Sequence, residues 1–187
     1  MSSLYLVLDL INDLVTGEGA LVKEIERRAV LARSADAIAK ARAAGVPVGY
    51  VRVGFSGTRE APRCSPLLKP LHDAGYLRLG TTGTEVHPMV APRPGDLDIV
   101  KHRVGAFWGT ALDLILRAKG IDKLYVSGVS TTYAVSSTVR EAHDRDLEIV
   151  LLEDCCAAGS QDEHDGVIEA LRALSGTITT SDSVEFA

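Results

Sequence analysis

The stretch VSGVSTTYAVSST, Val126 to Thr138, decides the fold of this chain. It begins inside the apolar, β-branched run KLYVSG (123–128), which is typical of a buried strand. A turn rich in serine and threonine follows. It leads to apolar residues at the helical spacing of three and four, namely Ala134, Val135, Thr138, Val139 and Ala142. The stretch is therefore predicted to join a buried strand to a helix, where α/β folds commonly bind ligands.

The same alternation of strand and helix patterns extends along the chain. Further strands are predicted over residues 4–10, 46–53, 97–101, 148–154 and 177–181. Helical stripes run from Val22 to Ala39, from Leu112 to Leu116 and from Val167 to Leu174. Nearly continuous apolar strands indicate a sheet that is covered on both faces. We expect one α/β domain over residues 1–187, doubly wound, with a mostly parallel sheet of about six strands and helices on both faces.

Composition excludes several function classes. The 187 residues are 46% hydrophobic, and the net charge of -5 leaves no basic surface for nucleic acid. The first residues, MSSLYLVLDLINDL, contain no basic region and soon reach Asp9, so neither a signal peptide nor a membrane span is expected. We therefore expect a cytoplasmic protein. Three cysteines without a CxxC pair indicate neither a disulfide scaffold nor a zinc site.

Residues 54–96 interrupt the pattern with a long connection that holds most of the prolines. Such a connection in a compact domain is usually functional, so we interpret it as a lid or a subunit-contact loop, with an ordered structural excursion as the alternative. We expect several of its apolar side chains to be exposed and to favour a homodimer or higher homo-oligomer: Pro66, Leu67, Leu68, Leu71, Tyr76 and Leu77.

Charged residues end three of the predicted strands. Asp9 follows the first strand, Arg52 ends the second and Lys101 ends the third, while the turn GVSTTYA (128–134) follows the fourth. Each of these is common as a cap or a solvated side chain when it occurs alone. Because parallel strands end at one edge of the sheet, the pattern predicts that they converge in a single site there.

Three motifs now show a resemblance to a known family. They are LVLDLINDLV (6–15), IVKHRVGAFWGTALDLIL (99–116) and LYVSGVSTTYAVSSTVREAHDRDLEIVLLEDCCAA (124–158). In this order and spacing the chain resembles the isochorismatase-like, or cysteine hydrolase, superfamily. That superfamily includes isochorismatases, nicotinamidases and N-carbamoylsarcosine amidases. The resemblance implies an isochorismatase-like fold, hydrolase activity on a small molecule and a symmetric homo-oligomer.

The resemblance also implies roles for single residues. Asp9 matches the family's general acid and base, and Lys101 matches the lysine beside it. The peptide between Val129 and Ser130 matches a cis bond that directs backbone N–H groups, together with the turn at Tyr133, toward a developing oxyanion. The nucleophilic cysteine of the family falls on Ala134, which cannot form an acyl-enzyme.

Three explanations of Ala134 stay open. The first is a naturally thiol-free hydrolase in which Asp9 protonates a vinyl ether or assists cleavage of a C–N bond. The second is an amidase that carries a Cys→Ala change. The third is a small-molecule-binding protein that has lost its catalytic activity. Nicotinamidase members hold a metal through Asp and His residues after the second strand. RVGFSGTREAPR (52–63) has no histidine there, so we expect neither metal nor cofactor.

Four residues are candidates for substrate binding: Arg52, Arg103, Phe107 and Trp108. An arginine near a catalytic edge can hold a carboxylate, so a small anionic or planar substrate is expected. A local ion pair for Arg103 and core packing for Trp108 are the alternatives. The hydroxyls of Ser130 and Thr131 are expected to cap the helix, and His164 to be a solvated helix residue.

Overall fold

A computed structural model describes residues 2–57 and 59–187 of the chain. Six parallel strands form one sheet in the order β3-β2-β1-β4-β5-β6. Their bounds are β1 Ser2–Leu8, β2 Val48–Val53, β3 Leu97–Lys101, β4 Ile121–Val129, β5 Glu148–Ala157 and β6 Thr177–Thr179. The predicted doubly wound α/β fold is thus confirmed, with every strand pair parallel.

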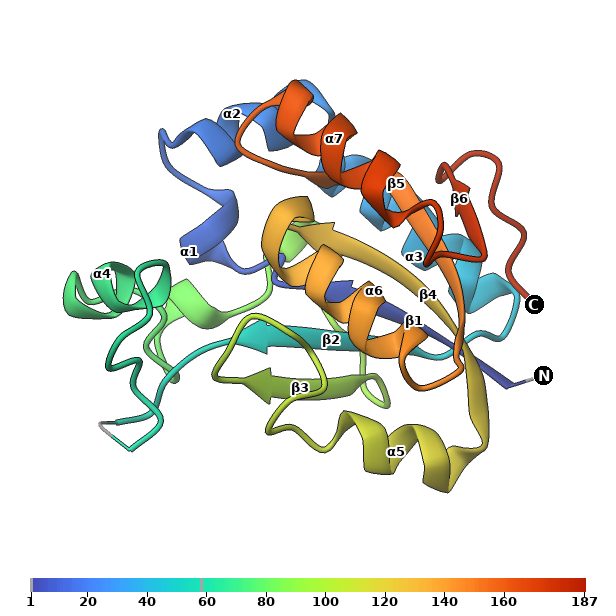
Figure 1. Cartoon of the computed structure of the whole chain (residues 1–187), viewed down its shortest axis with the longest axis horizontal. Coiled ribbons are helices and arrows are strands. Elements are labelled where there is room, and N and C mark those ends of the chain that lie inside the picture. Colours follow the sequence, from blue (N-terminus) through green and yellow to red (C-terminus); the bar gives the residue numbers. More distant parts are fainter. Residues whose placement is uncertain (1, 58) are drawn as a thin grey trace.

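Helices cover both faces of this sheet (Figure 1). One face packs on α2 Ala20–Arg27 and α3 Val30–Ala43, with Tyr5, Val7 and other alternate strand residues beneath them. The opposite face carries Leu4, Leu6 and Leu8 and packs on α5 Leu112–Lys119, α6 Ser136–His143 and α7 Gln161–Leu171. Because successive strand residues point to opposite faces, two apolar layers require the nearly continuous apolar strands seen in the sequence. No helix in the described ranges has the length and apolar character that crossing a bilayer needs.

The prediction of one helix from Val22 to Ala39 is wrong, because this stretch forms two helices. The chain breaks between α2 and α3, where Ala29 takes a left-handed conformation with φ of 53°. That conformation is costly for a residue with a Cβ, and alanine gives no sequence signal for it. The apolar spacing continues across the break, because both helices pack on the same face of the sheet.

The described residues of the segment 54–96 include short helices. These are α4 Leu68–Asp73 and the 3₁₀ turns η1 Thr82–Thr84 and η2 Pro88–Val90. The expectation that Leu68 and Leu77 are exposed is wrong, since they are 6% and 0% exposed and pack with Ile11, Val53 and Phe55 of the same chain. These two leucines therefore no longer argue for self-association, and the homo-oligomer stays a prediction.

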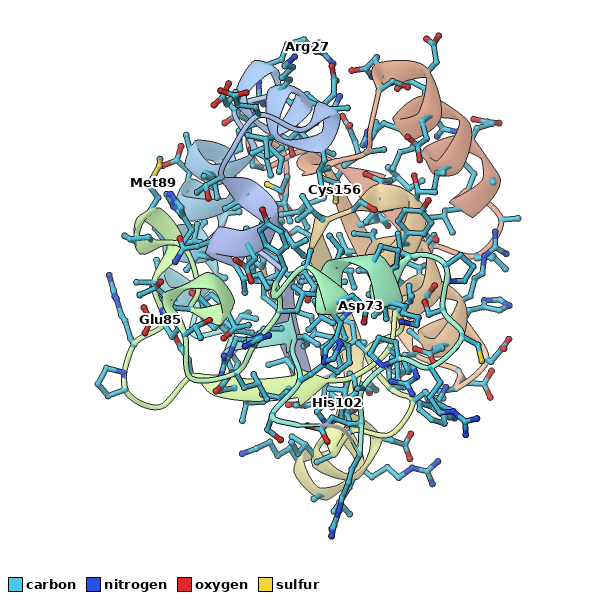
Figure 2. All side chains as sticks on the ribbon, turned by 90° about the vertical axis from the view of Figure 1, so that its left-hand side faces the viewer. Arg27, Asp73, Glu85, Met89, His102 and Cys156 are labelled. Atoms are coloured by element: carbon cyan, nitrogen blue, oxygen red, sulfur yellow. The ribbon has the colours of Figure 1, made fainter. Side chains whose placement is uncertain are left out.

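The strand order places the site. From β1 the chain adds β2 and β3 on one side, and from β4 it adds β5 and β6 on the other. Ligands in such sheets bind at the carboxyl ends of the strands, in the crevice where the order reverses, here between β1 and β4. Figure 2 views the molecule from this edge, with α4, marked by Asp73, in front of the strand ends. The short helix α1, Asn12–Val15, follows β1 at the same edge.

Candidate active site

A buried ion pair lies at the centre of this edge. Asp9 follows β1 directly, Lys101 is the last residue of β3, and their side chains are 4% and 2% exposed. Lys101 Nζ lies 2.7 Å from Asp9 Oδ2 and also donates to the carbonyl oxygen of Val104 at 2.5 Å. The second carboxylate oxygen, Asp9 Oδ1, accepts from the backbone N–H of Val53 at 2.7 Å. Both charged groups are therefore fixed in position by short hydrogen bonds.

Burial raises the pKa of the Asp9 carboxyl above its ordinary value of 3.8, because removal from water disfavours the charged form. The charge of Lys101, its hydrogen bond and the Val53 N–H all oppose this and lower the pKa. Desolvation is the largest of these effects, so the carboxyl holds a proton to higher pH than an exposed aspartate does. A carboxyl with this property can both give and take a proton, which suits general acid and base chemistry.

The turn after β4 lies beside this pair. Gly128 has a φ of 126°, and a Cβ built there would lie 2.0 Å from the carbonyl oxygen of Leu8, so no side chain fits between β4 and β1. The peptide between Val129 and Ser130 is cis, as the resemblance implies. A π-helical turn, η3 Thr131–Val135, follows and runs into α6. The backbone of the quoted stretch thus changes direction beside the end of β1, where Gly128 pairs with Leu8.

A cavity of about 300 Å³ opens at this point. Its polar wall is formed by the residues Asp9, Lys101, Arg103, Ser130 and Glu163. Ala134 lies in the wall between these groups and is 3% exposed. The remaining wall is mostly apolar and comprises Leu14, Leu21, Val53, Leu67, Leu68, Leu71, Leu77, Val104, Val129 and Tyr133, with Gly159 at one side. The site is therefore a small, largely apolar chamber around one buried acid and its lysine.

Two consecutive residues of α7 hold the η3 turn. His164 Nδ1 lies 2.9 Å from Thr131 Oγ1, and Glu163 Oε1 accepts from Thr132 Oγ1 at 2.5 Å. The other side of the His164 ring lies 3.2 Å from Glu153 of β5. The prediction that His164 is solvated is wrong, since it is only 1% exposed. Its spacing of four and seven from the buried residues Ile168 and Leu171 was a sequence signal for this burial.

Comparisons with known proteins agree with this geometry. The isochorismatase domain matches residues 3–183. The chain belongs to the isochorismatase family. It is 36% identical over 140 residues to the isochorismatase family protein YecD of Escherichia coli O157:H7, covering 74% of this chain and 72% of that protein.

Two further relatives of this isochorismatase-family chain have names that state an activity. One is the ureidoacrylate amidohydrolase RutB of Methylobacterium radiotolerans, 30% identical over 164 residues, which cover 80% of this chain and 64% of that protein. The other is the crystal structure of N-carbamoylsarcosine amidase from Thermoplasma acidophilum, with a TM-score of 0.80, 28% identity and 99% of each chain covered. With its family established, the chain is a hydrolase of the isochorismatase-like superfamily.

Three of the four predicted substrate-binding residues of this isochorismatase-family chain lie outside the cavity. Arg52 instead forms a two-pronged ion pair with Asp98 of β3, at 2.6 and 2.7 Å, because the two side chains meet across neighbouring strands. Phe107 is 3% exposed and packs in the core against α5 and α6. Trp108 is 65% exposed, and the guanidinium carbon of Arg103 lies 5.9 Å from the centre of its ring.

Arg103 is the one of these four that lines the cavity. One nitrogen of its guanidinium donates to the carbonyl oxygens of Glu60 and His102. The expectation that Ser130 and Thr131 cap the helix is wrong, because η3 has no side-chain cap. Thr131 is bound to His164 instead, and Ser130 lines the cavity.

The native cysteines are separate from this wall. Cys155 and Cys156 are buried in β5, and burial raises the pKa of Cys156 to about 12 and raises that of Cys155 further. Both thiols are therefore inert near neutral pH. Cys64 is exposed in the segment 54–96 and does not line the cavity. Within residues 2–57 and 59–187, no cluster of three His, Cys, Asp or Glu side chains is arranged to hold a metal.

Proposed function

We propose that this isochorismatase-family hydrolase cleaves a small metabolite without metal or covalent intermediate, through protonation by Asp9. The proposal rests on the buried carboxyl of Asp9, whose pKa is raised and which lines the cavity. Ala134 lines the same cavity at the position of the family's cysteine. A methyl group cannot attack a carbonyl, whereas a protonated carboxyl can donate to carbon or oxygen. Acid catalysis followed by addition of water is the chemistry that these groups support best.

For a vinyl ether the proposed steps balance without another reactant. Asp9 donates its proton to the terminal alkene carbon, which leaves an oxocarbenium ion paired with the new carboxylate. Water adds to this ion, and the proton that it loses returns to Asp9. The resulting hemiketal then breaks its C–O bond and gives a carbonyl compound and an alcohol, so that one water is consumed overall.

Lys101 and the backbone of the turn have supporting roles in this proposal. The ammonium at 2.7 Å from Asp9 stabilises the carboxylate that forms when the proton leaves. The backbone groups around Val129 to Ala134 form a cradle for an oxyanion or carboxylate. Arg103 lines the cavity and holds an anionic group of the substrate.

Hydrolysis of a C–N bond is the second candidate, supported by the names of the two relatives that state an activity. One is an amidohydrolase and the other an amidase. In this candidate reaction Asp9 activates a water molecule, which replaces the thiol as the nucleophile. Otherwise the chain is an amidase that carries alanine at the position of its nucleophile. The third possibility is a protein that binds a small molecule without converting it. The experiment below distinguishes it from the two hydrolase candidates.

A panel of vinyl ethers, primary amides and N-carbamoyl compounds in D2O tests the proposal. Protonation at carbon places one deuterium in the new methyl group of the carbonyl product at each turnover. This product is reduced as it forms, so that later exchange is prevented, and is then analysed by mass spectrometry. Cleavage of amides or N-carbamoyl compounds without carbon-bound deuterium supports the second candidate. Binding without turnover of any compound supports the third possibility.

A further inference from the structure

The charged side chains of the cavity are already hydrogen bonded within the chain. Asp9 uses both carboxylate oxygens, on Lys101 and on the Val53 N–H. The Glu163 carboxylate accepts from Thr132 Oγ1 and from the backbone N–H of Gly159 at 2.9 Å. A substrate that takes up these oxygens must compete with bonds that hold the site together.

The hydroxyl of Ser130 is different. Its oxygen is buried and has no hydrogen-bond partner among the residues that the structure describes. Ser130 comes directly before the η3 turn, where a serine usually caps the helix, yet it makes no cap hydrogen bond. Ser130 is one of the residues that line the cavity. This hydrogen-bonding capacity is unused among the described residues, and a rotation about the Cα–Cβ bond would turn the hydroxyl toward a molecule bound in the cavity.

Four other buried hydroxyls in the described ranges also lack a partner, and they give a comparison. They belong to Ser34, Tyr50, Thr138 and Ser175, and none of these residues lines the cavity. Buried polar groups are normally paired, so each exception needs an explanation. For Ser130 the explanation can be a ligand, because of the five residues it is the one that a cavity-bound molecule can reach.

We propose that Ser130 is a substrate-binding residue whose hydroxyl donates a hydrogen bond to the oxygen that gains negative charge as the bond breaks. That atom is the leaving oxygen of a hemiketal or the carbonyl oxygen of an amide. The assignment rests on the proposed function, since it needs a hydrolysable substrate in this cavity. It adds a side-chain donor to the backbone cradle, on the same residue that follows the cis peptide.

Two variants of nearly equal shape test the hydroxyl. Ser130→Thr keeps it, and Ser130→Val replaces it with a methyl group. On a panel compound that the wild type converts, the valine variant should have a kcat/KM about 10- to 100-fold below that of the threonine variant. The two variants should differ little in Tm, because the wild-type hydroxyl has no partner among the described residues. Equal kcat/KM values for the two variants would overturn the assignment.

Ser130→Ala and Ser175→Ala form the matched control. Each removes one buried, unpaired hydroxyl, so neither should lower the Tm, but only the change at Ser130 should reduce kcat/KM. If the wild type converts no panel compound, the proposed function fails and Ser130 is tested by binding. Ligand-observed NMR with the primary amides should then show a Kd about 3- to 10-fold weaker for Ser130→Val than for Ser130→Thr. Equal affinities, or no binding to the wild type, would overturn the assignment in that case.

Discussion

The two walls of the cavity are built in different ways. The polar wall is built mainly from strand ends and the turns after them, with Glu163 added from α7. Asp9 and Lys101 are held there by contacts of 2.5 to 2.7 Å. The apolar wall contains mostly leucines, which come from α1, α2 and the segment 54–96 and pack without directional bonds. A shift of the strand register would separate the polar groups, whereas the leucines can be exchanged for other apolar residues of similar volume.

The two walls therefore have different roles: the groups held by hydrogen bonds determine the reaction, and the apolar side chains determine mainly how tightly a substrate binds. Hydrogen bonds fix a proton donor in one geometry, and a reaction depends steeply on that geometry. Apolar contacts depend mainly on buried area, so a changed side chain alters affinity in small steps. We therefore expect substitutions of Asp9 and Lys101 to act on kcat and those in the apolar wall to act on KM.

The largest effect is expected for Asp9→Asn. Loss of a positioned general acid typically lowers the rate about 10²- to 10⁴-fold. The change also leaves the buried ammonium of Lys101 without its anion, which typically destabilises a fold by about 3–5 kcal/mol. Steady-state kinetics and urea unfolding measure the two effects. The double variant Asp9→Asn/Lys101→Met should recover stability and not activity, and recovery of both would contradict the assigned role.

The pH dependence of the rate tests the protonation state that the polar wall imposes. Because burial raises the pKa of Asp9, kcat should fall as pH rises through that raised value if the protonated carboxyl is the reactive form. The folded state also binds this proton more tightly than the unfolded chain does. The bound proton therefore stabilises the folded state fully below pH 3.8, and this stabilisation is lost as pH rises through the folded-state pKa of Asp9. A kcat that rises over this range would identify Asp9 as a base.

A smaller effect is expected at the junction of the two walls. Ala134→Cys places a thiol in the cavity wall near Lys101, whose ammonium should lower the thiol pKa. We expect it to react with iodoacetamide about tenfold faster than Cys64, with Cys155 and Cys156 unreactive. Mass spectrometry of digested protein gives the four rates separately. A rate no higher than that of Cys64 would place the site elsewhere, and new amidase activity would favour the amidase reading.

The smallest effect is expected in the apolar wall. Leu71→Ala removes part of a half-buried side chain from the cavity lining and should raise KM about three- to tenfold with kcat nearly unchanged. Leu114→Ala is a matched control, since Leu114 is 70% exposed and does not line the cavity. A change at Leu71 that lowered kcat as much as Asp9→Asn does would remove the distinction between the walls.

The sequence allowed prediction of the polar wall better than of the apolar one. Asp9 follows β1, Lys101 ends β3 and Ala134 lies in the turn after β4. Parallel strands bring their carboxyl ends together at one edge of the sheet, whatever the loops do. The same reasoning was wrong for Arg52, because side chains at a strand end can also turn to a partner on the next strand, here Asp98. The spacing of residues in the sequence does not show whether a strand-end side chain enters the site or pairs with a residue of the neighbouring strand.

The apolar wall depends on how the segment 54–96 folds back over the sheet. No periodic pattern covers that segment, so the sequence did not show that Leu68 and Leu77 face the cavity and the core. The break at Ala29 was missed for a related reason, since the backbone changes direction there while the apolar spacing continues. His164 is a different case, because its burial follows from a helical spacing that the sequence contains.

The hydrogen bonds between α7 and the η3 turn have a consequence for the synthesis of the protein. A chain leaves the ribosome from its N-terminus, so Asp9, Lys101 and Ala134 are all made before Glu163 and His164. Until α7 has emerged, Thr131 and Thr132 lack the partners that hold the turn in the finished fold. The nascent chain therefore carries Asp9, Lys101 and Ala134 before the residues that hold the η3 turn have been made, and this turn can take its final form only after α7 has emerged.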